Sequence, residues 1–125
     1  MKRSKIFGWT LTGLAVLFLA FDSIGKLMEI DEVVIATTNL GYPAGSVFKI
    51  GVILFISTLL YAVPKTSVIG ALFLTAYLGA AVATNFRVEN PLFSHILFPV
   101  YVAIVVWLSL ALRNKNIFLF LLNRL

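Results

Sequence analysis

Four apolar stretches long enough to cross a lipid bilayer fill most of this chain, over residues 6–26, 44–63, 66–86 and 92–112. A membrane-spanning helix needs about 20 mostly apolar residues to cross about 30 Å of hydrocarbon. Hydrophobic residues make up 61% of the chain and charged residues 12%, whereas soluble domains have roughly 45–50% and 25%. The pattern predicts an all-α protein, with one domain over residues 1–125 that forms an antiparallel four-helix transmembrane bundle.

The connections between these stretches predict how the helices are joined. Pro64 lies in a short turn, and Thr66 and Ser67 follow it as candidate caps for the next helix. The longest connection, 27–43, shows weak helical periodicity, which predicts a short interfacial helix that Gly41 ends, with Pro43 in the first turn of the next helix. Residues 116–125 are apolar but too short to span, so we expect an interfacial tail.

The distribution of Lys and Arg predicts the orientation in the membrane. Residues 2–5 form a basic start without a small-x-small cleavage site, so we interpret the first stretch as a span and not as a cleaved signal peptide. The ends predicted to share a side with the N-terminus carry seven Lys and Arg and no acidic residue: Lys2, Arg3, Lys5, Lys65, Arg113, Lys115 and Arg124. Short loops rich in Lys and Arg stay in the cytoplasm. We therefore expect a multi-pass cell-membrane protein with both termini in the cytoplasm.

Charged and polar residues gather at the opposite ends of the four stretches. Ionisable groups at membrane depth are costly and mark functional sites by default. Antiparallel packing would bring these residues together near the outer leaflet, where they form a candidate ligand-binding site: Asp22, Lys26, Tyr42, Lys49, Asn85, Arg87 and His95. A structural role is the alternative for several of them, since Asp22 and Lys26 form an i,i+4 pair and Lys49 is able to snorkel outward.

A row of small residues predicts the direction of Arg87. Ala71, Thr75, Gly79 and Ala83 recur every fourth residue, and the same spacing leads to Arg87. Small residues let membrane helices approach closely, so we expect this row to face the bundle and Arg87 to point inward. Asp22 is then the expected partner of Arg87. Pro99, four residues after His95, is expected to kink the last helix.

Several chemistries are excluded or lack a motif. The chain has no cysteine and a single histidine, which excludes disulfides, cysteine metal sites and a bis-histidine haem within one chain. No phosphate-binding loop, dinucleotide motif or nucleophile elbow is present. The net charge of +5 is explained by membrane topology, so we expect no nucleic-acid partner.

The combined pattern resembles the DoxX-like family of small four-helix membrane proteins over residues 9–113. The resemblance is carried by the Asp22-x-x-x-Lys26 pair, the LGYP segment 40–43, the segment 77–87, the His95 and Pro99 entry to the last helix, and its Trp107 to Arg113 ending. Membership implies a link to quinol or thiosulfate oxidation or to oxidative-stress membrane complexes. The chain carries no electron carrier of its own, so a redox role would need a bound quinone or a partner protein.

Three functions are compatible with these residues. The first is a binding or accessory subunit, without enzymatic activity of its own, that holds a quinone or lipid-like ligand in a polar pocket near the outer leaflet. The second is a structural subunit or assembly partner in a redox complex or a homo-oligomer. The third is a proton-coupled carrier or enzyme that uses Asp22 and His95.

Overall fold

The computed structural model describes residues 2–43, 45–113, 116, 119 and 123, and five α-helices account for most of them. In chain order these are α1 (Lys2–Leu27), α2 (Asp31–Asn39), α3 (Ser46–Ala62), α4 (Ser67–Arg87) and α5 (Phe98–Arg113). A 3₁₀ turn, η1 (Pro64–Thr66), joins α3 to α4, and a π-helical turn, η2 (Leu92–Ile96), precedes α5. The predicted tail over 116–125 lies largely outside the described residues.

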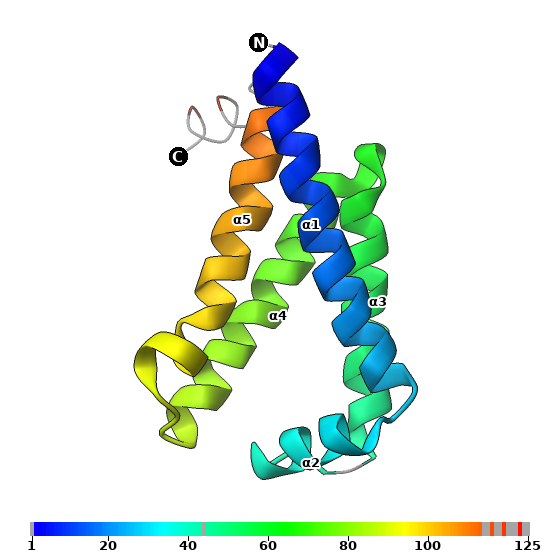
Figure 1. Ribbon diagram of the computed structural model, residues 1–125, viewed down its shortest axis with the longest axis vertical. Coiled ribbons are helices and arrows are strands. Elements are labelled where there is room, and N and C mark those ends of the chain that lie inside the picture. The colour runs from blue at the N-terminus through cyan, green and yellow to red at the C-terminus, as the bar shows by residue number, and fades with distance from the viewer. Residues whose placement is uncertain (1, 44, 114–115, 117–118, 120–122, 124–125) are drawn as a thin grey trace.

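The four long helices alternate in direction and form a closed ring (Figure 1). Each packs against its two neighbours, in the order α1, α3, α4, α5 and back to α1. Three segments are apolar and long enough to cross a membrane, namely Arg3–Leu27, Pro64–Arg87 and Leu92–Arg113. The apolar helix α3 has 17 residues, or about 26 Å at 1.5 Å per residue. The expected all-helical fold and the short helix within 27–43 are confirmed, the latter as α2. The four expected spans are shown only in part, because α3 is shorter than a standard span.

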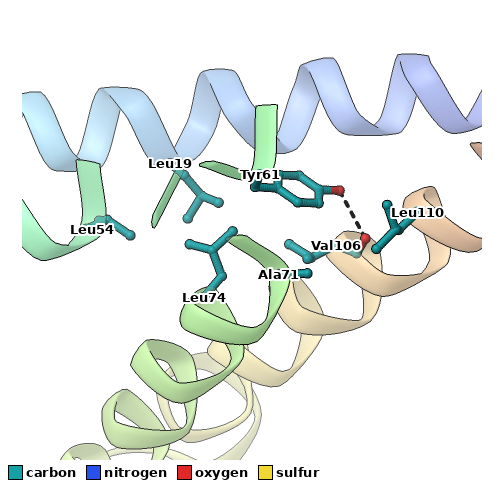
Figure 2. Close-up of a cluster of buried hydrophobic side chains, with 7 residues drawn as sticks. All are labelled: Leu19, Leu54, Tyr61, Ala71, Leu74, Val106 and Leu110. Atoms are coloured by element: carbon teal, nitrogen blue, oxygen red, sulfur yellow. Dashed lines mark hydrogen bonds between the residues drawn. The ribbon is translucent and has the colours of Figure 1, made fainter. Parts of the chain in front are cut away.

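The buried core lies where the ring is tightest. Figure 2 shows that side chains from α1, α3, α4 and α5 meet here: Leu19, Leu54, Tyr61, Ala71, Leu74, Val106 and Leu110. The Tyr61 hydroxyl donates to the carbonyl of Val106 at 3.0 Å and also contacts the Ser109 hydroxyl. Gly70 allows α4 to pack closely against α3 at this level, because a Cβ there would overlap the backbone of Tyr61. Hydrogen bonding and close packing therefore join α3, α4 and α5 at one level.

The turn between α3 and α4 uses its hydroxyl groups differently from the prediction. Thr66 and Ser67 do not cap α4 with their side chains; the Thr66 hydroxyl donates to the Leu60 carbonyl at 2.7 Å, and the Ser67 hydroxyl donates to the Tyr61 carbonyl at 2.8 Å. The last carbonyls of a helix have no intrahelical donor, so these hydroxyls satisfy the end of α3. Pro64 lies in the 3₁₀ turn, which ends α3 as expected.

The helix α2 ends in a glycine-dependent turn, as predicted for Gly41. Gly41 has φ of 98°, and its N–H donates to Thr38 while the N–H of Tyr42 donates to Thr37. This pair of bonds is the Schellman motif, which needs a residue with positive φ after the helix. Pro43 precedes α3 by three residues instead of lying in its first turn, so that part of the prediction is wrong.

The last span is interrupted before Pro99. The N–H groups of Ile96 and Leu97 donate five residues back, to Pro91 and Leu92, and regular α-helix starts only at Phe98. A proline ring clashes with the carbonyl four residues earlier, which for Pro99 is that of His95. The helical irregularity therefore lies before the proline, as a π-helical turn.

Candidate functional site

A cavity of about 580 Å³ lies inside the ring near α2. All five α-helices contribute to its wall, which is mostly apolar and includes Phe18, Phe21, Ile53, Phe98 and Val102. Its volume falls within the roughly 300–1,000 Å³ typical of small-molecule sites. Leu19 belongs both to this wall and to the buried core, so the core closes the cavity on one side.

One ion pair lies in this otherwise apolar wall. The Lys26 ammonium lies 2.6 Å from Oδ1 of Asp22, one turn earlier on α1. The Lys26 side chain is 13% exposed and that of Asp22 is 38% exposed. Neighbours four apart share a face of a helix, so α1 alone positions both groups. Because the two charges compensate each other, the pocket presents a polar but electrically neutral patch.

Three more polar groups of the wall make hydrogen bonds within the protein. The hydroxyls of Tyr42 and Thr84 are 2.6 Å apart, which connects the segment after α2 to α4. Asn85 donates to the Ala81 carbonyl at 2.8 Å and accepts a bond from Asn90 at 2.6 Å. These bonds hold the side chains in place, because moving them would break hydrogen bonds that satisfy their polar groups.

Two polar groups at the pocket remain free for a ligand. Among the described residues, nothing hydrogen-bonds to the hydroxyl of Tyr77 or to the second carboxylate oxygen of Asp22, and both residues line the pocket. A tyrosine hydroxyl donates or accepts, and a carboxylate oxygen accepts. The pocket therefore offers these two groups, together with the ammonium hydrogens of Lys26 that do not bond to Asp22, against an apolar background.

The structure places the seven predicted site residues in two groups. Asp22, Lys26, Tyr42 and Asn85 line the pocket. The remaining three are exposed and lie outside its wall: Lys49, Arg87 and His95. His95 is in η2, where its Nδ1 lies 2.8 Å from the Ser94 hydroxyl.

The expected pairing of Asp22 with Arg87 is wrong. The Arg87 guanidinium donates through Nη2 to the carbonyl oxygen of Leu40 at 2.6 Å, and Asp22 pairs with Lys26 instead. Arg87 thus binds the C-terminal end of α2 from across the bundle. Its contact is structural, and it does not place a positive charge in the pocket.

The small-residue row of α4 does not face the bundle, which explains the error. Ala71 is buried, but Thr75, Gly79 and Ala83 are exposed. Successive α-helical residues are about 100° apart, so each step of four turns the row by about 40°. The row has left the buried face by Thr75, and Arg87 lies three steps further along it. Thr75 accepts a hydrogen bond from the indole of Trp107 at 2.7 Å on this outer side.

Sequence reasoning missed Tyr77 as a pocket residue, because tyrosines in membrane proteins also anchor interfaces. Tyr77 lies on the wall together with Leu78, Ala81 and Asn85 of α4. These positions recur at spacings of three and four around the same face. A signal was therefore present: Tyr77 lies eight residues before Asn85, on the same helical stripe.

The fold and the cavity define a class, that of multi-pass helical membrane proteins with an internal pocket. Within this class the chain belongs to the DoxX-like family, whose model matches residues 10–109. No curated protein and no solved structure matches the chain. The resemblance inferred from the sequence motifs is thereby confirmed.

Proposed function

We propose that this protein is a membrane-embedded binding module, an accessory subunit that holds an amphipathic ligand of the quinone or lipid type in its pocket. The observation that carries the proposal is the cavity of about 580 Å³, whose apolar wall contains a compensated ion pair and a free tyrosine hydroxyl. Small-molecule sites combine apolar walls with a few placed polar groups in this way.

The chemistry of the polar patch favours a ligand with an uncharged polar head. The positive charge of Lys26 is already compensated by Asp22 at 2.6 Å, so an anionic head group would meet no net attraction. The Tyr77 hydroxyl is able to donate to a carbonyl oxygen, and the free oxygen of Asp22 is able to accept from a hydroxyl. A quinone carries the carbonyl, its reduced form carries the hydroxyl, and both have an apolar body.

A redox link follows from the ligand and not from the chain itself. Electron transfer chemistry is supplied by a cofactor, while the protein binds and orients it. A bound quinone or a redox protein partner would supply the electron-transfer chemistry here. This proposed redox role rests on the same pocket.

The proposed orientation places the pocket near the outer leaflet. The N-terminal end of α1, the η1 turn and the C-terminal end of α5 lie together, away from α2 (Figure 1). We call this the basic end; Arg3, Lys5, Lys65 and Arg113 belong to it, and no acidic residue lies in these segments. Positive loops stay in the cytoplasm, which supports cytoplasmic termini and an outward-facing α2.

A structural subunit or assembly partner without its own ligand is the second candidate. Gly79 and Ala83 favour it, because they are exposed on α4 and nothing lies within 4 Å of a Cβ built at Gly79. Small residues allow a helix of another chain to approach closely. A proton-coupled carrier using Asp22 and His95 receives less support, because His95 lies outside the pocket wall.

Mass spectrometry of the protein, released gently from its membrane in a mild detergent, tests the proposal. We expect a retained small molecule in the wild type and its loss in Ala81→Phe, because Ala81 lines the pocket. The matched control is Ala83→Phe, which makes the same change two residues away on the exposed face of α4. A wild type that retains a protein partner and no small molecule would support the second candidate and contradict the first.

A further inference from the structure

Arg113 is a buried cation at the basic end, far from the pocket. It is the last residue of α5 and is 6% exposed. Its guanidinium carbon lies 4.4 Å from the centroid of a Trp9 ring and 5.4 Å from that of Tyr61. Aromatic faces attract guanidinium groups in this way. The two rings therefore hold the group in place but leave the edge formed by Nε and Nη2 to other partners.

One edge of this guanidinium has no partner among the described residues. Nε and Nη2 are both buried, and no hydrogen bond reaches either of them in the described part of the chain. These two nitrogens point to the same side, where they donate two parallel bonds to two oxygens of a carboxylate or phosphate. A buried polar group without a partner is costly. The geometry therefore calls for an oxyanion beside this edge.

The acidic side chains of the chain are too far away to supply it. All five acidic residues lie at positions 22, 29, 31, 32 and 89, at the other ends of the helices. A Cβ at Gly8 of α1 would touch the backbone of Arg113 at 2.9 Å, and Asp22 is 14 residues further along that helix, or about 21 Å. No side chain crosses that distance. None of these acidic side chains therefore pairs with Arg113, and a bound molecule is the source that we consider.

Phosphate is the oxyanion that the surroundings favour. Trp9 is 45% exposed at the end of an apolar span, and tryptophan is enriched at the level of the lipid head groups. Arg3 and Lys5 lie within two turns of it on α1. Basic clusters beside membrane spans attract anionic lipids. We propose that Arg113, held between Trp9 and Tyr61, binds the phosphate of an anionic membrane lipid through Nε and Nη2.

Binding requires a local opening, because both nitrogens are buried. Arg113 ends α5, and the ends of helices open at a lower free energy than their centres. The lipid thus replaces neighbouring atoms at one helix end and leaves the core around Leu74 and Val106 intact. This site is independent of the pocket ligand, which lies at the other end of the bundle.

Thermal unfolding in an uncharged detergent tests the proposal. Phosphatidylglycerol is added to the full-length protein in one arm, and phosphatidylcholine or inorganic phosphate in the others. We expect phosphatidylglycerol to raise the melting temperature of the wild type more than the other two do. Arg113→Lys keeps the charge but loses the bidentate pair of N–H donors. Because one charge-assisted hydrogen bond is lost, the affinity of the variant for phosphatidylglycerol should fall about tenfold.

Lys65→Gln is the matched control, because it removes one exposed positive charge from the same end and should keep the wild-type response. Each shift is measured against the same variant in phosphatidylcholine, which separates lipid binding from a change in intrinsic stability. An unchanged phosphatidylglycerol response in Arg113→Lys would overturn the proposal. A response to inorganic phosphate alone would overturn the lipid as its source. Equal responses of the wild type to both lipids would also overturn it, whether or not the variant folds.

Discussion

Asp22 and Lys26 show how a single turn of helix places charge inside an apolar pocket. The two side chains are four residues apart, and their 2.6 Å contact needs nothing from the other helices. A lone charge in this wall would be costly, whereas the pair compensates itself. The free oxygen of Asp22 is then available to a ligand without leaving Lys26 unpaired.

Replacing Asp22 with Asn should destabilise the protein through Lys26. The Lys26 side chain is 13% exposed, and its ammonium group would lose its partner, which costs about 1–3 kcal/mol in free energy of unfolding. Unfolding by sodium dodecyl sulfate in mixed micelles measures this loss. A double-mutant cycle of Asp22→Asn with Lys26→Gln should give a coupling energy of about 0.5–3 kcal/mol.

Arg87→Gln provides the control for that cycle. It shares no contact with Asp22 in the structure, so the effects of the two substitutions should add within about 0.5 kcal/mol. A strong coupling between Asp22 and Arg87, together with none between Asp22 and Lys26, would contradict the described pairing.

At this scale the sequence predicts local pairs but not the direction of side chains on different helices. The Asp22 and Lys26 pair is visible from spacing alone. The direction of Arg87 depends on the rotation of α4 about its axis, and the row of small residues indicated the wrong face because it drifts around the helix. The burial of Arg113 between Trp9 and Tyr61 joins three helices, so no local pattern contains it.

The element that covers the pocket is α2, which is held by contacts from two directions. Its Val33, Ala36 and Thr37 line the pocket, and Val33 lies 3.5 Å from a Cβ built at Gly25 of α1. On the other side of the bundle, Arg87 of α4 binds the carbonyl of Leu40 at 2.6 Å, and Thr84 binds Tyr42. The cover is thus connected to α4 by polar bonds beyond its own C-terminal turn.

Arg87→Gln should loosen this cover without unfolding the bundle. The substitution removes the bond to Leu40, while Arg87 itself is exposed and leaves no cavity. Hydrogen exchange of residues 31–42 should become faster, because local opening depends on few contacts, and the global melting temperature should change little. Lys49→Gln is the matched control, since Lys49 is an exposed cation outside the pocket wall. Equal exchange in both variants would contradict the role given to Arg87.

The presence of the helices was predictable from the sequence, whereas the interruption of the last helix before Pro99 was not. The predicted spans agree closely with α1, α3 and α4, because their apolar composition decides where they lie. The helix within 27–43 and its glycine end were also visible, since Gly41 has a specific backbone role. The π-helical turn before α5 depends on how the backbone avoids the clash between the Pro99 ring and the His95 carbonyl. Several backbone conformations avoid this clash, and the sequence does not select one of them.

The whole molecule separates its charges by end. The basic end carries cations alone in its described segments, while all acidic residues lie toward the pocket end. In the proposed topology this separation would set the orientation during insertion, and it also separates a neutral pocket from a cationic surface. The sequence contained this asymmetry in full, because it depends on helix order and not on packing.

Single cysteines in this cysteine-free chain should report the orientation directly. Lys65 and Glu89 are exposed and lie at opposite ends of α4. A maleimide that cannot cross the membrane should label Glu89→Cys in intact cells and Lys65→Cys only after permeabilisation. The reverse pattern would invert the proposed topology.

The divergence of the long helices toward α2 gives the molecule a tapered outline (Figure 1). Its cross-sectional area is therefore larger in one leaflet than in the other, so the protein has the shape of a wedge in the bilayer and not of a cylinder. Membranes accommodate mismatched inclusions at a small elastic cost that sorts proteins among them. The taper should concentrate this protein where the leaflet around α2 is expanded by curvature. On the proposed function, lateral pressure on the wide end should also change the ligand occupancy of the pocket.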